Sequence, residues 1–372
     1  MKAEGKITGV IGGGLAGLIS SILLAKQGLQ VILLERKMYP FHRVCGEYIS
    51  NEVLDFLKRE GLYPEFLDLP QIKFFEFSDT DGKSVKIPLD LGGFGISRFV
   101  LDQWLVDQAV RLGVSVRTGC QVISVEFHEN SDSFSIGLAD HTAVHADFVI
   151  GAFGKRSKLD KVLHRPFIQK RSPYIGVKYH VKTDYVRDAV ALHNFNGGYC
   201  GLNAIEDHQF NLCYLGSRDQ LREFGTVEEM ERQILWRNPI LRKIFKESEF
   251  LFEKPEVINE INFEPKLPVE NHILMAGDSA GLITPLCGNG MAMAIHSGKL
   301  AAEAITTGRS RKEIEKLYEK NWTGEFKQRL WVGRNVQRLF GSGGASVFAR
   351  NLIERTPFFA KQIIKNTHGK PF

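Results

Sequence analysis

The chain has 372 residues, of which 43% are hydrophobic and 24% are charged, and its formal net charge is +5 at pH 7. A chain of this length and composition buries a substantial core and forms one large domain or two interleaved domains. Acidic and basic residues are mixed along the sequence, so the small positive charge suits an anionic cofactor and gives no reason to expect nucleic acid as a partner.

The cysteines indicate a reducing compartment. Their number, five, is odd and no C-x-x-C occurs, which argues against a disulfide framework and against a structural zinc site. We therefore expect free thiols, no metal and a cytoplasmic location. The N-terminal residues 1–6 run straight into a strand, which predicts no secretory signal, and no apolar run reaches transmembrane length.

The first elements form a βαβ unit. Ile7 to Ile11 is predicted as a buried strand, Leu15 to Gln27 as a helix that ends at Gly28, and Gln30 to Leu34 as a second strand. This order predicts a parallel sheet.

The later elements alternate between α/β and antiparallel β material. Helices are predicted at 51–60, 99–112 and 227–247, and mostly helix from residue 289 onward. Strands are predicted at 71–91 around a turn at 79–82, at 114–117, 121–127, 133–138 and 147–152, in a meander over 174–216, and at 256–263 and 272–276.

This order predicts an α/β fold in which a Rossmann-type nucleotide-binding domain carries an inserted antiparallel β-sheet domain and a helical C-terminus. The nucleotide-binding domain is expected to comprise residues 1–70, 97–160 and 268–310. Residues 71–96 and 161–267 are expected to form the substrate domain, and residues 311–372 the C-terminal helical segment.

The first motif is Gly12-x-Gly14-x-x-Gly17, between the first strand and the first helix. Its glycines permit a tight turn, a close approach of a pyrophosphate, and packing of the helix on the strand. Glu35 ends the next strand, where a carboxylate can accept hydrogen bonds from ribose hydroxyls. A glycine-rich turn without a ligand is the less favoured interpretation.

The second motif is an apolar strand, Ile273 to Ala276, followed by Gly277-Asp278 and by the segment Pro285 to Met291. Together with the first motif, it resembles the FAD fingerprints of the p-hydroxybenzoate hydroxylase and geranylgeranyl reductase superfamily. The resemblance implies that Asp278 binds the ribityl chain and that N–H groups at the following helix start face the flavin. A helix N-terminus there would stabilise an anionic reduced flavin.

Two further segments match the same superfamily. Pro40 to Glu47 resembles the P-x-x-x-x-C-G segment of geranylgeranyl reductases, which places Cys45 and Gly46 near the flavin and makes Arg43 a candidate for the pyrophosphate. Cys45 is either a reactive thiol or, as we favour, an inert buried residue. Arg98 opens a helix and either contacts FAD or pairs with Asp102 on one helix face.

The resemblance assigns cofactor binding to residues from both fingerprints and from the segments between them. These residues are Gly12, Gly14, Leu15, Ala16, Gly17, Glu35, Arg36, Arg43, Cys45, Gly46, Arg98, Val122, Gly154, Gly277, Asp278, Pro285, Gly288, Asn289, Gly290 and Met291.

The electron donor is less well indicated than FAD. Aromatic hydroxylases of the superfamily carry Asp-Gly where this chain has Phe153-Gly154, and that aspartate is linked to the binding of FAD and NAD(P)H. A second G-x-G-x-x-G does not occur. Both observations argue against direct use of NADH or NADPH and against a separate NAD(P)H domain. Lys155 and Arg156 could still attract phosphates, so the sequence leaves the electron donor open, with NADH or NADPH as one candidate.

The substrate half offers weak catalytic candidates. Tyr199 matches the first position of the Y-x-W-x-F-P segment of geranylgeranyl reductases, but the residues after it do not match. Cys45, His193 and Tyr199 are the candidates, and a lone strand histidine is more often structural. The 26 phenylalanines fit either a cavity for an aromatic or lipid-like substrate or an ordinary core.

The C-terminal stretch from Ile314 to Phe359 mixes basic and apolar residues. A solvated helical face is the default interpretation, and peripheral contact with a membrane surface is the alternative.

The leading functional expectation is a monooxygenase that uses a flavin C4a-hydroperoxide to hydroxylate or epoxidise a hydrophobic or aromatic small molecule. The alternative is a geranylgeranyl reductase-like enzyme that saturates a prenyl lipid. A flavin-binding protein without turnover is the third and least favoured reading.

Overall fold

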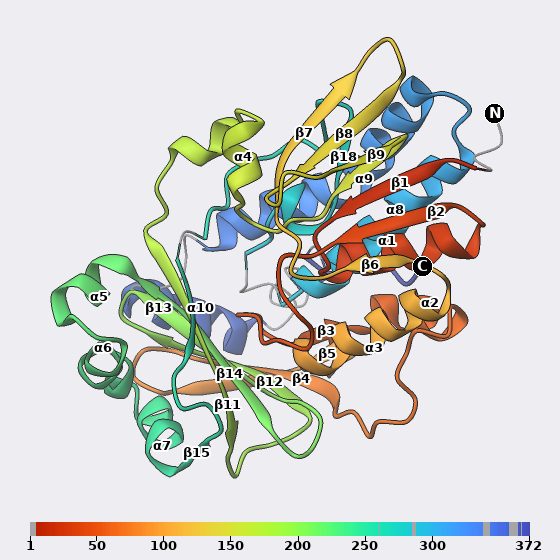
Figure 1. Cartoon of the computed structure of the whole chain (residues 1–372). Helices are drawn as coiled ribbons and strands as arrows, with labels where there is room; N and C mark the ends of the chain where they lie inside the picture. The colour runs from red at the N-terminus through yellow and green to blue at the C-terminus, as the bar shows by residue number, and fades with distance from the viewer. Residues whose placement is uncertain (1–4, 260, 285–287, 338–342, 357–363, 366) are drawn as a thin grey trace.

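Figure 1 shows the computed structural model, with one β-sheet region above and a second, larger sheet below. The structure describes residues 5–259, 261–284, 288–337, 343–356, 364–365 and 367–372. Strands from distant parts of the sequence meet in each sheet, so the chain passes repeatedly between the two halves. Segments that are far apart in the sequence are therefore brought together at the junction of the halves.

The upper sheet is mainly parallel. Its strand order is β17 (Val269–Glu270), β18 (Ile273–Met275), β10 (Phe148–Gly151), β1 (Ile7–Ile11), β2 (Gln30–Leu34) and β6 (Ser115–Arg117), and only the β17–β18 pair is antiparallel. The parallel strands β1, β2, β10 and β18 all end at one edge. In open α/β sheets, ligands bind at this edge.

The lower sheet is antiparallel except where β12 lies parallel to β4. Its order is β15 (Glu249–Phe250), β11 (Tyr174–Lys182), β14 (Phe210–Ser217), β13 (Gly198–Ala204), β12 (Ala189–Phe195), β4 (Gln71–Ser78), β5 (Ser84–Gly95) and β3 (Tyr48–Ser50), while β16 (Glu256–Asn259) pairs with β11. A small third sheet consists of β7 (Val122–His128), β8 (Ser133–Leu138) and β9 (Ala143–Ala146).

The helices divide between the two halves (Figure 1). Their bounds are α1 (Leu15–Lys26), α2 (Leu54–Arg59), α3 (Arg98–Arg111), α4 (Lys158–Val162), α5 (Arg218–Phe224), α6 (Val227–Gln233), α7 (Pro239–Glu247), α8 (Gly290–Thr307), α9 (Arg311–Gln337) and α10 (Gly343–Arg355). Short 3₁₀ turns cover Asn51–Val53, Pro166–Gln169, Leu235–Arg237 and Gly277–Ser279. Within the described residues, no helix is both long and apolar enough to cross a membrane.

Helices α1 and α8 approach each other closely because Gly298 lies between them. A Cβ at Gly298 would stand 2.5 Å from the carbonyl oxygen of Ala16, which is closer than packed atoms allow. The contact packs the middle of α8 against the first turn of α1.

The structure confirms the predicted α/β fold with an antiparallel sheet and a helical C-terminal region. The first βαβ unit agrees with the prediction to within one residue. The predicted helix over 227–247 is divided, because Asn238 caps a new helix that starts at Pro239. The strand predicted over 256–263 is shorter, and residues 261–263 form no strand.

Candidate functional site

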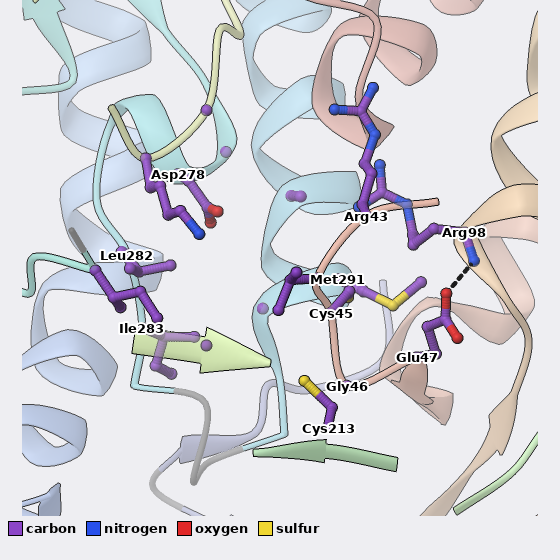
Figure 2. A pocket seen from close by; sticks show the side chains of 18 of the residues that line it. Arg43, Cys45, Gly46, Glu47, Arg98, Cys213, Asp278, Leu282, Ile283 and Met291 are labelled. Atoms are coloured by element: carbon purple, nitrogen blue, oxygen red, sulfur yellow. Dashed lines mark hydrogen bonds between the residues drawn. The ribbon is translucent and has the colours of Figure 1, made fainter. Parts of the chain in front are cut away.

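A cavity of about 720 Å³ lies between the two sheets. One wall is formed by the loops after β1, β2, β10 and β18, and the opposite wall by strands of the lower sheet. Figure 2 shows Arg43 and Arg98 on one side of this cavity and Asp278, Leu282 and Ile283 on the other, with Cys45 and Met291 between them. The cavity therefore joins the predicted cofactor residues to the substrate half.

The glycines of the first motif have three different surroundings. Gly12 has φ +103°, and a Cβ there would lie 2.3 Å from the carbonyl oxygen of Ala152. A Cβ on Gly17 would lie 2.0 Å from the carbonyl oxygen of Gly12. At Gly14, the nearest atom to an added Cβ is Nη2 of Arg98 at 3.6 Å. Gly12 and Gly17 are thus required by the turn itself, whereas Gly14 faces open space in the cavity.

The N-termini of α1 and α8 lack capping side chains. Gly14 and Asn289 occupy the N-cap positions, no side chain among the described residues caps either helix, and neither first turn contains an acid. By contrast, Ser97, Ser157 and Asn238 cap α3, α4 and α7 with their side chains. Both uncapped ends line the cavity, so their backbone N–H groups are available to an anionic ligand.

The acid at the end of β2 is tied to the glycine turn. The buried carboxylate of Glu35 accepts hydrogen bonds from the backbone N–H of Gly13 at 2.8 Å and of Lys37 at 2.9 Å. Tyr39 donates to the carbonyl oxygen of Gly13 at 2.5 Å from the other side. These contacts hold Glu35 at the cavity wall beside the turn that would receive a pyrophosphate.

Two arginines share one buried carboxylate. Asp102 pairs with Arg98 at 2.7 Å and with Arg43 at 2.9 Å. The pairing of Arg98 with Asp102, which the sequence left open, is therefore present, and both arginines also line the cavity. Arg43 also pairs with Glu35 at 3.4 Å, so two carboxylates face the two guanidiniums, and the ion pairs hold both arginines beside the glycine turn.

The carboxylate of Asp278 faces two lysines across the cavity wall. It accepts no hydrogen bond within the described part of the chain, and burial raises its pKa although Lys266 and Lys155 act in the opposite direction. Lys266 donates to the backbone carbonyls of Lys155 and Asp278, both at 2.8 Å, and burial lowers its pKa to about 8. Asp278 thus has free acceptors for a hydroxylated ligand.

The segment after Arg43 forms the floor between the two sheets. Cys45 lines the cavity, and burial raises the pKa of its thiol, so little thiolate exists at neutral pH. Cys213 of β14 lines the same cavity, and burial raises the pKa of its thiol to about 12. Burial thus keeps the Cys45 thiol neutral, which makes it a weak nucleophile that still carries its proton.

The other two catalytic candidates have different positions. Tyr199 lines the cavity and donates to Gln337 of α9 at 3.5 Å. His193 does not line it: both ring nitrogens are engaged, with Ser78 at 3.0 Å and Tyr185 at 3.2 Å, and burial lowers its pKa to about 4. The environment of His193 is that of a structural histidine.

Most of the predicted cofactor residues line this one cavity. They are Gly12, Gly14, Leu15, Ala16, Glu35, Arg36, Arg43, Cys45, Gly46, Arg98, Val122, Gly154, Gly277, Asp278, Gly288, Gly290 and Met291. Gly17 and Asn289 lie behind its wall, and Asn289 instead donates to Glu52 at 3.1 Å. Pro285 lies outside the described residues.

The far end of the cavity is predominantly apolar. Its walls come from β4, β12 and β16 of the lower sheet, from the loop after Asp278, and from α10. The apolar residues are Phe75, Phe77, Val190, Leu192, Ile258, Ile261, Leu282, Ile283, Phe348, Ala349, Leu352 and Ile353. Tyr199 packs in the same cluster and adds one hydroxyl, so this end suits a mainly apolar ligand.

Several functional positions were not found from the sequence. Glu47 follows the quoted Cys45-Gly46 pair, but its partners Lys178 and His180 lie 131 and 133 residues further along the chain. Tyr39 also gave no local signal. Only the position of Glu47 directly after a recognised segment could have drawn attention to it.

Comparison with known proteins gives related sequences and similar folds. Residues 6–307 match a family described as FAD binding domain. The chain is 23% identical over 351 residues to conditioned medium factor receptor 1 of Dictyostelium discoideum, which covers 85% of this chain and 67% of the receptor. It is 25% identical over 338 residues to digeranylgeranylglycerophospholipid reductase of Methanosarcina acetivorans, covering 84% and 79%.

Among solved structures, PqsL of Pseudomonas aeruginosa in complex with 2-aminobenzoylacetate superposes with a TM-score of 0.74. The match covers 92% of this chain and 99% of PqsL at 16% identity. At this identity the likeness describes the fold.

Proposed function

This chain belongs to the FAD binding domain family and is an FAD-dependent oxidoreductase, and we propose that it adds two hydrogens to a carbon–carbon double bond of an apolar, lipid-like substrate. The observation that carries the proposal is the cavity, in which the fingerprint residues for FAD continue directly into an apolar chamber. The Methanosarcina relative is named a reductase of a prenyl lipid. The Dictyostelium relative is named a receptor, so relatedness alone does not decide the reaction.

In this proposal residues at the edge of the parallel sheet would hold FAD. Glu35 would bind the adenosine ribose, Gly14 and the start of α1 would bind the pyrophosphate, and Arg43 and Arg98 would offer N–H donors beside it. Asp278 would bind the ribityl hydroxyls, for which its unoccupied acceptors are suited. The uncapped start of α8 would favour negative charge on the flavin.

The apolar end of the cavity supports the substrate class. A hydroxylated or ionised aromatic substrate would need buried polar partners, because an unpaired polar group in such a site is costly. The side chains contributed by Phe77, Leu192 and Ile261 offer only apolar surface. An isolated double bond in a hydrocarbon chain needs no polar partner.

Saturation of a double bond adds a hydride to one carbon and a proton to the other. FAD supplies the two-electron chemistry when bound, and the chain must deliver a proton to a place that excludes water. Cys45 lines the cavity with a thiol that burial keeps protonated. We assign the proton to Cys45, while Leu282 and Ile283 hold the hydrocarbon chain in place.

For the electron donor we propose NADH or NADPH. The loop after β10 contributes Lys155, Arg156 and Lys158 to the cavity wall, and these side chains attract an anionic dinucleotide. Phe153 stands where related hydroxylases carry an aspartate linked to NAD(P)H binding, which argues against the donor. A dedicated NAD(P)H domain is not expected, because the sequence has no second G-x-G-x-x-G.

Oxygen insertion, which the motifs alone favour, is the second candidate. Only Tyr199 matches the aromatic segment of geranylgeranyl reductases, and this departure favours hydroxylation or epoxidation of a hydrophobic molecule in the same chamber. Both candidates share FAD and the apolar substrate. They differ in whether oxygen enters the product.

A lipid-like substrate also suggests where the protein meets its source. Phe348 of α10 lines the cavity and is 63% exposed, so the apolar chamber reaches the surface at α10. We place peripheral contact with a membrane surface at this point, since an exposed aromatic beside an opening favours insertion between lipids.

Product analysis tests the proposal. The flavin-loaded protein is incubated with prenyl lipids and a reductant, once without oxygen and once with isotopically labelled O₂. Reduction predicts a product that has gained two hydrogens in both conditions and contains no label. A labelled product formed only with O₂ would transfer the assignment to oxygen insertion. The variant Cys45→Ala should lose the reduction while it retains the flavin.

A further inference from the structure

A buried ionic cluster joins the cofactor half to the lower sheet directly beneath the cavity. The carboxylate of Glu47 accepts from Nζ of Lys178 at 2.5 Å, from Nε2 of His180 at 2.7 Å and from the backbone N–H of Arg98 at 2.7 Å. Glu47 and Lys178 are fully buried, and His180 is only 4% exposed. Figure 2 shows the Arg98–Glu47 hydrogen bond beside Cys45 and Gly46.

Glu47 also has an unusual backbone conformation. Its φ is +52°, in the left-handed region that a residue with a Cβ rarely adopts. Such a conformation is strained and persists when its surroundings impose it. The three contacts of the carboxylate are the surroundings that impose it here. This strain is concentrated at the turn that carries Cys45 and Gly46 into the cavity wall.

The lower sheet holds the same turn through its backbone. Asn211 of β14 donates to the carbonyl oxygen of Gly46 at 2.9 Å, and Asn203 of β13 donates to that of Glu47 at 3.3 Å. Both asparagines line the cavity and are buried. The turn at Gly46 and Glu47 therefore accepts hydrogen bonds from three strands of the lower sheet, β11, β13 and β14.

The charge on Glu47 is maintained in this setting. Burial alone would raise its pKa, but Lys178 and His180 outweigh burial and lower it. A cluster of this kind contributes little net stability compared with apolar residues of similar size, because desolvation opposes the attraction. Stability alone therefore explains poorly why a lysine and a glutamate are buried at this position.

We propose that Glu47 is a positioning residue for the flavin, which it serves by fixing the Cys45-Gly46 turn against the cofactor through its contacts with Lys178 and His180. The inference rests on the proposed placement of the flavin beside Cys45 and Gly46. The lower sheet, which forms the substrate wall, thereby acts on the flavin environment through the carboxylate of Glu47.

The test compares Glu47→Gln, Lys178→Met and the double variant in the flavin-loaded protein. Three quantities are measured: the unfolding temperature, the dissociation constant for FAD, and the visible absorption band and midpoint potential of the bound flavin. Asp160→Asn is the matched control. Asp160 is also fully buried, pairs with Arg165 at 2.9 Å and accepts a backbone N–H, but it does not line the cavity.

Each single variant removes one charge of the Glu47–Lys178 pair and leaves the other less well compensated. Each is expected to lower the unfolding temperature and to weaken FAD binding by about tenfold or more. The double variant removes both charges and should regain most of the unfolding temperature. Its FAD affinity, absorption band and midpoint potential should stay altered, because the turn is no longer fixed. Asp160→Asn should lower the unfolding temperature and leave the flavin properties unchanged.

Two results would overturn the inference. In one, the flavin properties return together with stability in the double variant. In the other, Asp160→Asn alters the flavin as strongly as Glu47→Gln does. A wild-type protein that binds no FAD would instead contradict the proposed cofactor site, and the two failures are therefore distinguishable.

Discussion

The carboxylate of Glu35 accepts the backbone N–H of Gly13 at 2.8 Å, which locks the end of β2 to the turn after β1. The other oxygen accepts the backbone N–H of Lys37 at 2.9 Å, and Glu35 also lines the cavity. Glu35 therefore has two roles, because it holds the glycine turn in shape and also lines the site. Different substitutions of Glu35 should affect these two roles to different extents.

Substitution of Glu35 separates these two roles. Glu35→Gln retains an acceptor for Gly13 but loses the charge, so FAD affinity should fall only a few-fold. Glu35→Leu leaves the N–H of Gly13 unpaired and should cost about 1.5–3 kcal/mol of FAD binding. Quenching of flavin fluorescence on titration measures both. Asp107→Asn, at an exposed carboxylate of α3, serves as the control and should change neither. Equal losses of FAD affinity in Glu35→Gln and Glu35→Leu would contradict the role of Glu35 in shaping the turn.

The glycines of the first motif should respond in opposite ways to alanine. Gly14→Ala places a Cβ in open cavity, so the unfolding temperature of the flavin-free protein should not fall, while FAD affinity drops by about tenfold or more. Gly17→Ala places a Cβ 2.0 Å from the carbonyl oxygen of Gly12 and should destabilise the fold by about 1–3 kcal/mol. Calorimetry with and without FAD distinguishes the two variants by their unfolding temperatures. Loss of stability in Gly14→Ala would show that the turn, not the ligand, requires this glycine.

Asp278 should favour FAD binding at the expense of the flavin-free fold. Burial raises its pKa, so above that pKa the folded state holds a carboxylate that the unfolded chain solvates better. Asp278→Asn should therefore raise the unfolding temperature of the flavin-free protein near neutral pH. The gain should shrink as pH falls toward the ordinary aspartate value of 3.8, below which both states bind the proton.

The same variant should bind FAD more weakly, because an amide is a poorer acceptor for ribityl hydroxyls than a carboxylate. Thermal unfolding across pH and a flavin titration are the two measurements. A variant that loses stability near neutral pH would contradict the assignment of Asp278 as a group held in the site for its ligand.

His193 should influence stability and not flavin chemistry. Burial lowers its pKa from 6.5 to about 4. Between these pH values His193 binds a proton in the unfolded chain but stays neutral in the folded chain. The contribution of neutral His193 to the free energy of unfolding is complete above pH 6.5 and falls by about 3 kcal/mol as pH decreases to about 4. Urea unfolding at a series of pH values should show this slope in the wild type and a shallower one in His193→Gln. A change in FAD affinity in His193→Gln would contradict a purely structural role.

The sequence predicted those parts of the molecule that local pattern determines. The turn from Gly12 to Gly17 and the strand end at Asp278 were recognised because each combines an apolar strand with residues that a ligand at its carboxyl end requires. The division of the 227–247 helix was missed, although Pro239 and the capping residue Asn238 mark it. The parallel pairing of β12 with β4 has no local signature, since alternation of apolar residues does not identify a partner strand.

The contacts that complete the site could not be predicted for a similar reason. Glu47 and Lys178 meet only because the lower sheet returns to the cofactor half after more than a hundred residues. Likewise, the rings of Phe372 and His296 stack with their centroids 3.8 Å apart, which brings residue 372 back to α8. Pairs of this kind depend on the tertiary fold, and either residue alone resembles an ordinary core or surface residue.

The most direct test of the proposed reaction is rapid mixing of the reduced, flavin-loaded protein with an unsaturated prenyl lipid in the absence of oxygen. The proposal predicts that the visible absorbance of oxidised flavin returns at a rate that increases with lipid concentration, and that the lipid recovered has gained two hydrogens. If the flavin stays reduced until O₂ is admitted, and the lipid then carries oxygen, the proposed double-bond reduction is wrong.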